Sequence, residues 1–255
     1  MPVINKKLKV KNIVFGEGMP KICIPVTEKN AESIVETVRE YERHKGWDVL
    51  EVRIDFFEDY EDIEKIISLL KDIRTVTSRL VLATIRTFEE GGQVSLSQDV
   101  YLDTIKAMCE SGFIDLVDIE LTKGNSCVTQ CIYAAHANDV VTIISKHDFN
   151  ETPDNYTMKK YLHKMDDLGG DILKIAVMPQ NKADVIRVLE VTDEVNSEVK
   201  PLLITISMGF LGSITRISGE SYGSVMTFAT IGKESAPGQI PLVEMVRSLR
   251  MLHKK

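Results

Sequence analysis

The chain carries, at positions 171–178, the stretch Asp171-Ile172-Leu173-Lys174-Ile175-Ala176-Val177-Met178. Its length and its β-branched residues are typical of a buried strand, and a lysine stands at its centre. Such a lysine either reaches solvent over a packed stem or lies inside, where burial opposes its charge. A free lysine has a pKa of about 10.4, and a nucleophilic amine near neutral pH needs one lower by about 3 units, or about 4 kcal/mol. An apolar wall and neighbouring cations could supply that shift.

Similar strand-like stretches recur at steps of roughly thirty residues, with helical patterns between most of them. They begin near Lys21, Val49, Arg79, Phe113, Asp139, Asp171, Pro201 and Val225. Eight such units in 255 residues predict an α/β fold of the (β/α)8 TIM-barrel type. A doubly wound open sheet would show similar periodicity, but no Gly-x-Gly-x-x-Gly follows the first strand.

The segments between the strands show the apolar spacing of helices. Apolar residues recur at i, i+3, i+4 and i+7 over positions 31–41, 63–73 and 242–252. Thr152-Pro153-Asp154 predicts another helix start, with Thr152 as the N-cap, Pro153 in the first turn and Asp154 near the positive helix end.

The first twenty residues depart from this pattern. Leu8-Lys9-Val10 and Ile13-Val14-Phe15 flank Lys11-Asn12, which predicts a β-hairpin closing the bottom of the barrel. No interdomain linker or low-complexity tract follows. We therefore expect one catalytic domain over 1–255, with 1–20 as a hairpin extension.

Composition narrows the class of function. A net charge of −7 and a pI near 5.4, without a long basic run, argue against binding to nucleic acid or to a membrane surface. No stretch has the ~18 apolar residues of a membrane span, and the N-terminus does not resemble a signal peptide. We expect a cytoplasmic protein that acts on a small molecule. The cysteines lack the spacing of a disulfide framework or a zinc site, and we interpret them as packing residues.

Polar residues gather at the predicted carboxyl ends of the strands, where barrels of this type carry their chemistry. The second predicted strand ends with Glu51-Val52-Arg53-Ile54-Asp55, and the third ends at Arg86, with Glu90 following. The fifth ends at His147-Asp148, and the sixth carries Lys174. Met208 lies at the end of the seventh, and Arg216 comes after it. Taken singly, Glu51 with Arg53 or Glu90 with Arg86 could form internal ion pairs, and His147 could be a core histidine. Their convergence on one rim favours a catalytic pocket.

Seven short motifs follow one another along the chain. They are Glu51-Val52-Arg53-Ile54-Asp55, Arg86 through Glu90-Gly91-Gly92, Ser145-Lys146-His147-Asp148-Phe149, Lys174-Ile175-Ala176-Val177-Met178-Pro179, Ser207-Met208-Gly209, Arg216 with Gly219-Glu220, and Ser235-Ala236-Pro237-Gly238-Gln239. In the order and spacing of these motifs the chain resembles the type I 3-dehydroquinate dehydratases. Small differences lie beside these positions, such as Lys146 before the histidine.

The resemblance implies dehydration of 3-dehydroquinate to 3-dehydroshikimate, in the shikimate pathway, without metal or cofactor. It implies that Lys174 forms an imine with the substrate ketone, that His147 acts as general acid and base, and that Glu90 orients the imidazole. We expect Arg216 to bind the substrate carboxylate, since a guanidinium can grip two oxygens at once. The remaining contacts are implied for Glu51, Arg53 and Arg86 with ring hydroxyls, for Met208 and Phe228 as apolar walls, and for Ser235 and Gln239 as polar contacts. The resemblance also implies a homodimer.

The segment 232–239 combines glycines with polar side chains, which predicts a lid that closes over the ligand.

Other functions remain possible on the residues alone. A class I aldolase would share Lys174, although His147, Arg216 and Gln239 disfavour it. A binding protein without turnover would be expected to lose Lys174 or His147. A metal-dependent barrel would use Glu51, Asp118, Glu120 and His147, which form no tight ligand cluster in the sequence.

Overall fold

Eight strands pair in parallel and in chain order in the computed structural model, which describes residues 6–232 and 234–253. They are β3 (Lys21–Val26), β4 (Val49–Arg53), β5 (Leu80–Thr84), β6 (Leu116–Glu120), β7 (Val141–Asp148), β8 (Ile172–Val177), β9 (Leu202–Ser207) and β10 (Met226–Thr230). Strand β10 pairs with β3, and the curled sheet closes where the Val225 amide donates to the Leu203 carbonyl at 2.8 Å. The predicted TIM-barrel-like fold is confirmed.

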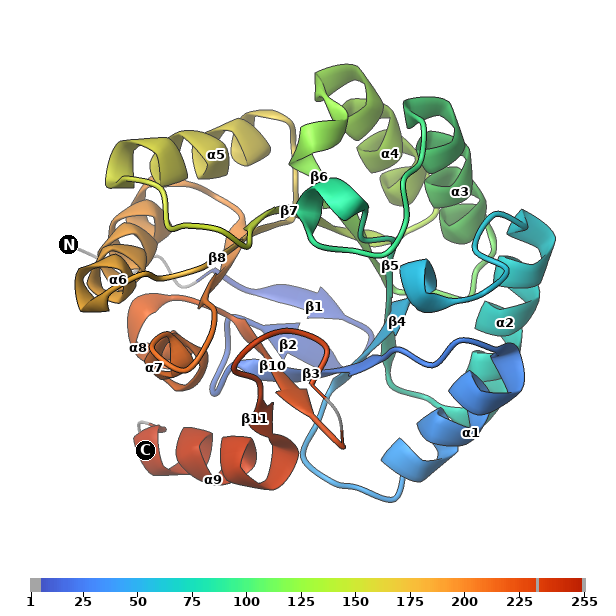
Figure 1. The fold of residues 1–255 in the computed structure, drawn as a ribbon, viewed down its shortest axis with the longest axis horizontal. Helices are drawn as coiled ribbons and strands as arrows, with labels where there is room; N and C mark the ends of the chain where they lie inside the picture. The colour runs from blue at the N-terminus through green and yellow to red at the C-terminus, as the bar shows by residue number, and fades with distance from the viewer. Residues whose placement is uncertain (1–5, 233, 254–255) are drawn as a thin grey trace.

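Helices surround the strands in a ring (Figure 1). They are α1 (Ala31–Tyr41), α2 (Ile63–Val76), α3 (Gln98–Glu110), α4 (Asn125–Ala137), α5 (Asn155–Asp167), α6 (Lys182–Glu198), α7 (Ser213–Ile217), α8 (Gly219–Tyr222) and α9 (Leu242–Leu252). Short 3₁₀ turns follow three strands as η1 (Ile54–Phe56), η2 (Phe88–Glu90) and η3 (Leu121–Lys123), and β11 (Ile240–Pro241) pairs beside β10. The helices predicted over 31–41, 63–73 and 242–252 lie where their apolar spacing placed them.

Hydrophobic side chains form two buried clusters, one on each face of the curled sheet. The outer cluster packs the helices against the strands, for example through Val38, Leu70 and Val188. The inner cluster fills the barrel. Separate clusters on the two faces follow from strand geometry, because successive side chains point to opposite sides.

The predicted N-terminal hairpin closes the amino end of the barrel. Strands β1 (Leu8–Val10) and β2 (Ile13–Phe15) pair antiparallel. Phe15 is fully buried in the inner cluster together with Val49, Leu116 and Ile172, which lie at or near the starts of their strands. The bottom of the barrel is therefore sealed by apolar side chains. Residues 1–5 of the predicted extension lie outside the described residues.

Several predicted element ends shift by two residues. Strand β4 ends at Arg53 rather than Asp55, and β5 ends at Thr84 rather than Arg86. The Asp55 carboxylate accepts a hydrogen bond from the Arg86 backbone amide at 3.2 Å, so a side chain takes the place of a ladder partner there.

The start of α5 was also predicted wrongly. Its N-cap is Asp154, whose carboxylate accepts from the Thr157 amide at 2.7 Å, whereas Thr152 lies buried two residues earlier. Asp154 has the extended backbone conformation of a cap, so it holds the role predicted for Thr152.

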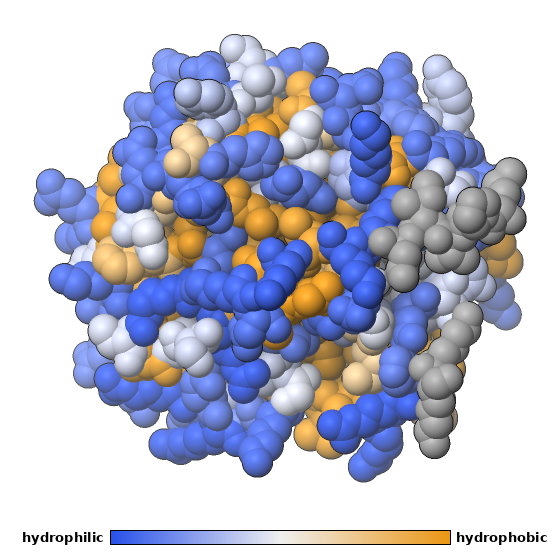
Figure 2. Space-filling view, turned by 180° about the vertical axis from the view of Figure 1, so that it is seen from behind, coloured by the Kyte–Doolittle hydropathy of each residue, from blue (hydrophilic) through white to orange (hydrophobic). Residues whose placement is uncertain are grey.

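Hydrophilic side chains cover most of the face shown in Figure 2, with apolar atoms visible near its middle. Within residues 6–232 and 234–253, no helix is both long and apolar enough to cross a membrane. All four cysteines are buried and unpaired, as expected of packing residues. Among the same residues, no group of three or more His, Cys, Asp or Glu side chains is arranged so that it could hold a metal ion.

Candidate active site

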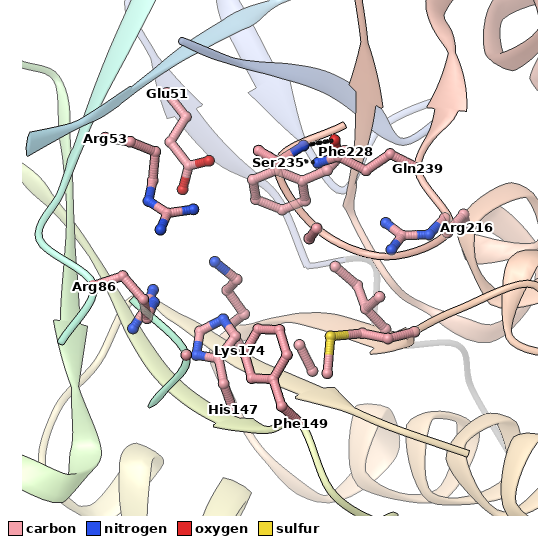
Figure 3. Close-up of a pocket in the computed structure, with 15 residues that line it drawn as sticks. Glu51, Arg53, Arg86, His147, Phe149, Lys174, Arg216, Phe228, Ser235 and Gln239 are labelled. Atoms are coloured by element: carbon pink, nitrogen blue, oxygen red, sulfur yellow. Dashed lines mark hydrogen bonds between the residues drawn. The ribbon is translucent and has the colours of Figure 1, made fainter. Parts of the chain in front are cut away.

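A pocket opens among the carboxyl ends of the strands (Figure 3). The residues that line it come from the strands, from the loops that follow them, from α7 and from the segment after β10. They are Glu51, Arg53, Arg86, Gly91, His147, Phe149, Lys174, Ala176, Ile206, Met208, Arg216, Phe228, Ser235, Ala236 and Gln239. Every residue predicted for the site is in this list except Glu90, which lies against His147. The fold thus brings residues that are far apart in the sequence together around one pocket.

Lys174 points into the pocket from the middle of β8 and is only 3% exposed. The solvent-reaching alternative therefore does not apply. Its Nζ donates to Asp118 Oδ2 at 3.1 Å and lies 4.7 Å from the centre of the Phe228 ring. The sequence predicted only an apolar wall and cations around the Lys174 amine. The structure adds the Asp118 carboxylate, which contacts the amine directly.

Asp118 is held from both sides in the interior. Its Oδ1 accepts from the Ser145 hydroxyl at 2.6 Å and lies 2.7 Å from Arg86 Nη2. Burial alone would raise the pKa of Asp118, but the positive charges of Arg86 and Lys174 hold it well below its usual value. Asp118 is therefore a fixed negative charge.

His147 lies near the end of β7, and its orientation is set by Glu90. The ring Nδ1 lies 2.9 Å from Glu90 Oε2, and the His147 backbone amide donates to the same oxygen at 3.0 Å. A carboxylate in this position favours the tautomer with a proton on Nδ1 and an unprotonated Nε2. Burial, followed by the charges of Arg86 and Lys174, lowers the pKa of His147 well below its usual value. The imidazole is thus a neutral base in the resting protein.

Glu90 itself is fixed within the turn η2. Its Oε1 accepts from the Thr122 hydroxyl at 2.9 Å and lies 3.5 Å from Lys146 Nζ. The next residue, Gly91, has φ +80° and packs against the Phe149 ring, where a Cβ would come within 2.3 Å. Only glycine fits there without displacing the aromatic wall of the pocket.

Arg86 is the centre of a buried network of carboxylates. Its Nη1 lies 2.9 Å from Glu120 Oε1 and 3.5 Å from Glu90 Oε2, in addition to the Asp118 contact. Burial raises the pKa of Glu120 above its usual value, although Arg86 opposes this. The internal ion pair considered for Arg86 with Glu90 is therefore present, although Arg86 also lines the pocket.

Arg53 and Glu51 do not pair with each other as the ion-pair alternative required. Arg53 instead forms two hydrogen bonds with Asp55, at 2.8 and 2.7 Å, and Glu51 accepts from the Thr84 hydroxyl at 2.9 Å. Both side chains reach the pocket (Figure 3). They place one acid and one cation on the side opposite Arg216.

Arg216 lies across the pocket from Arg53 and has no carboxylate within ion-pair distance among the described residues. Its Nη2 donates to the Pro237 carbonyl at 2.9 Å, and its buried Nε has no hydrogen-bond partner among the described residues. Burial lowers the pKa of Arg216 to about 10, although Glu234 opposes the shift, so the side chain is charged at neutral pH. A buried guanidinium with free donors is suited to bind a carboxylate.

The segment after β10 forms one wall of the pocket. Ser235 and Gln239 bond to each other twice, from the Ser235 amide to Gln239 Oε1 at 2.9 Å and from Gln239 Nε2 to the Ser235 hydroxyl at 3.0 Å (Figure 3). The Pro237 carbonyl also accepts from the Gly209 amide at 3.1 Å. This segment is thus joined to the β9 loop and to Arg216.

Asp118, Glu120 and Phe149 were not predicted for this site, and the first two were considered only as ligands of the metal-dependent alternative. Asp118 and Glu120 alternate on β6 as Glu51 and Arg53 do on β4, and that spacing could have marked them as facing the barrel interior. Phe149 lines the pocket beside His147, with ring centroids 6.4 Å apart. Its place in the His147-Asp148-Phe149 segment was the available signal.

Comparison with known proteins places the chain in a family. The family model described as "Type I 3-dehydroquinase" matches residues 22–255. A 3-dehydroquinate dehydratase of Listeria monocytogenes is 40% identical over 250 residues, covering 98% of this chain and 99% of that protein. One of Clostridioides difficile is also 40% identical, over 253 residues, with 98% and 99% covered.

Solved structures agree with the sequence comparison. A type I 3-dehydroquinate dehydratase from Clostridium difficile, described with covalent modified comenic acid, superposes with a TM-score of 0.94 at 39% identity and 98% coverage of both chains. The 3-dehydroquinate dehydratase of Geobacillus kaustophilus gives 0.94 at 37% identity, covering 99% of this chain and 98% of the other.

Proposed function

Because the chain belongs to the type I 3-dehydroquinate dehydratase family, the hydro-lyases of the shikimate pathway, we propose that Lys174 is its Schiff-base nucleophile and His147 its general acid and base. One observation carries the proposal. The amine of Lys174 and a neutral imidazole lie in the same pocket, and Glu90 holds Nδ1 so that Nε2 is free.

The first step joins Lys174 to the substrate ketone. The ammonium of Lys174 first gives up one proton, and the Nζ lone pair then attacks the carbonyl carbon. The carbonyl oxygen takes up that proton and a second one from nitrogen and leaves as water, so that an iminium with one N–H proton remains. Its positive nitrogen accepts the electrons released when the neighbouring carbon loses a proton, which makes that carbon far more acidic than in the free ketone. The C. difficile relative, described with a covalently modified ligand, supports covalent chemistry in this family.

His147 then moves the proton. Its Nε2 takes the proton from the carbon next to the iminium, and an enamine forms. The enamine expels the β-hydroxyl, which takes a proton from the imidazolium and leaves as water. Hydrolysis of the product iminium frees Lys174. Glu90 supports this cycle because its carboxylate accepts from Nδ1–H and balances the imidazolium charge.

Arg216 is proposed to bind the substrate carboxylate, since its Nε has no hydrogen-bond partner among the described residues and its charge lies inside the pocket. Glu51 and Arg53, across the pocket, are proposed to contact ring hydroxyls, and Arg86 to do so from within its ion-pair network. The remaining roles are apolar walls from Met208 and Phe228 and polar contacts from Ser235 and Gln239.

The segment 232–239 is proposed to act as a lid, because it joins Arg216 and the β9 loop over the pocket. Residue 233 lies outside the described residues.

A homodimer is proposed on the family resemblance, and equilibrium sedimentation measures the oligomeric state directly.

The covalent step is tested by incubating the protein with 3-dehydroquinate and borohydride and locating the reduced adduct by mass spectrometry. We expect labelling at Lys174. The variant Lys174→Met should remain unlabelled, and Lys182→Met, which removes an exposed lysine on the same βα unit, should be labelled like the unmodified protein. Turnover without labelling at Lys174 would force a different mechanism.

Product analysis separates the alternatives. An aldolase would also be labelled at Lys174 but would cleave a carbon–carbon bond, whereas the proposed reaction only loses water. A binding protein would take up the substrate without forming 3-dehydroshikimate.

A further inference from the structure

The proposed mechanism leaves unused the carboxylate closest to its nucleophile. Asp118 faces the barrel interior from β6, two strands from Lys174, and its Oδ2 lies 3.1 Å from Nζ. Both side chains are almost fully buried. The other oxygen is fixed by the Ser145 hydroxyl at 2.6 Å and by Arg86 at 2.7 Å. The carboxylate therefore has one oxygen anchored and one directed at the amine.

The charge of the lysine nitrogen is the same before and after the covalent step. A ketone and an ammonium group give an iminium and water: a C=N bond replaces the C=O bond, two of the three ammonium protons leave with the oxygen, and one positive charge stays on nitrogen. A buried positive charge is unfavourable unless an opposite charge or hydrogen bond offsets it. Any group that stabilises the buried ammonium from 3.1 Å is therefore positioned to stabilise the iminium as well.

We propose that Asp118 is the counter-ion of the lysine nitrogen throughout the reaction, in the resting protein and in the iminium alike. The inference rests on the proposed function, since it assigns a role within the chemistry of Lys174. Asp118 acts directly on the reacting nitrogen through its charge, and it need not exchange a proton with the substrate.

Asp118 fits a counter-ion better than a proton shuttle. The positive charges of Arg86 and Lys174 hold the pKa of its carboxyl well below the usual value even though burial opposes this. A carboxylate that stays ionised throughout keeps its negative charge beside the iminium.

A test of the Asp118–Lys174 pair must leave the other charged or titratable groups around it unchanged. They are Arg86, Glu90 and Glu120 in the network, Glu51 and Arg53 from β4, Cys23 from β3, His147 from β7, and Arg216 across the pocket. Glu120 offers a matched control. It lies on the same strand as Asp118, is equally buried and contacts the same arginine at 2.9 Å, but its oxygens bind Arg86 and Thr87 instead of Lys174.

The experiment measures the initial rate of cyanoborohydride labelling of Lys174 by 3-dehydroquinate from pH 6 to pH 9 in Asp118→Asn and Glu120→Gln. Without the negative charge of Asp118, the iminium should lose its N–H proton at a lower pH than it does in Glu120→Gln. The labelling ratio of Asp118→Asn to Glu120→Gln should therefore fall at least tenfold between pH 6 and pH 9, the equivalent of about one pKa unit.

A purely structural role of Asp118 would lower labelling equally at every pH, so a ratio constant within twofold overturns the inference. If Glu120→Gln and the unmodified protein are not labelled at Lys174, the proposed function itself fails. Circular dichroism checks folding. Where Asp118→Asn does not fold, Asp118→Ala tests the same charge: formate should restore labelling at pH 9 and formamide should not, and equal rescue by both would overturn the inference.

Discussion

Lys174 shows how one residue can be found in a sequence while its environment is not. An ammonium-bearing side chain inside an apolar strand is conspicuous, because an unpaired buried charge is strongly unfavourable. The partner that resolves the conflict, Asp118, lies 56 positions earlier in the chain and two strands away. Alternation along a strand predicts which side chains face inward, but the pairing of particular inward charges depends on the register between strands.

The same limit applies to the other site residues. The sequence placed His147 and Arg216 at the same rim, and both line the pocket. Strand spacing could not show that Arg53 would pair with Asp55 instead of Glu51, because the chain turns at η1 and carries the Asp55 carboxylate back to Arg53.

Replacement of His147 by alanine separates the covalent step from proton transfer. Lys174 should still form the adduct that borohydride traps, because the amine is unchanged, while turnover should fall by about 10²–10⁴-fold for want of a general base. Trapping and steady-state assays on the same sample measure the two effects. His163→Ala is the matched control, since that histidine pairs with Glu198 at 3.0 Å on the exposed surface. Near-normal turnover in His147→Ala would refute the role.

At the scale of single elements, periodicity predicted where helices and strands lie better than where they end. The apolar residues of α1 and α9 recur at helical spacing because one face of each helix packs on the barrel. Ends depend on individual hydrogen bonds, such as the Asp55 carboxylate that accepts from the Arg86 amide after β5. Several polar residues near each end could make such bonds, so the sequence alone does not choose among them.

The start of α5 gives a direct test of capping. Asp154→Ala removes the acceptor for the Thr157 amide and should lower the melting temperature by about 2–4 °C. Thr152→Ala should cost less, because the buried Thr152 hydroxyl has no hydrogen-bond partner among the described residues. Thermal unfolding followed by circular dichroism compares the two variants. The reverse order of effects would show that Thr152 is the cap after all.

For the whole molecule, eight repeated units predicted a closed barrel, and the strands pair in chain order as that prediction requires. Closure itself depends on a few local hydrogen bonds, from the Val225 amide to the Leu203 carbonyl and from the Thr205 amide to the Ser224 hydroxyl, which repeat spacing could not locate. The hairpin was predicted from its own pattern, and its buried Phe15 joins it to the inner cluster. We propose on this basis that the chain behaves as one domain.

Phe15→Ala tests the contribution of the hairpin to that domain. Loss of a fully buried phenylalanine should lower the free energy of unfolding by about 3–5 kcal/mol. Tyr156→Ala, which removes a 75% exposed ring, should change it little. Urea unfolding measures both. If the chain is one domain, Phe15→Ala should still unfold in one transition, with loss of the hairpin and loss of the pocket at the same urea concentration. Separate transitions for the two ends would show two independent units.

Because apolar side chains seal the amino end of the barrel, traffic into and out of the interior is confined to the opposite mouth. The proposed chemistry liberates one water when the imine forms, another when the hydroxyl departs, and consumes one to discharge the product. All of these water molecules enter or leave through the same pocket opening as the organic ligand. Events at that entrance, rather than diffusion through the protein, would then set the order in which reactants arrive and products depart.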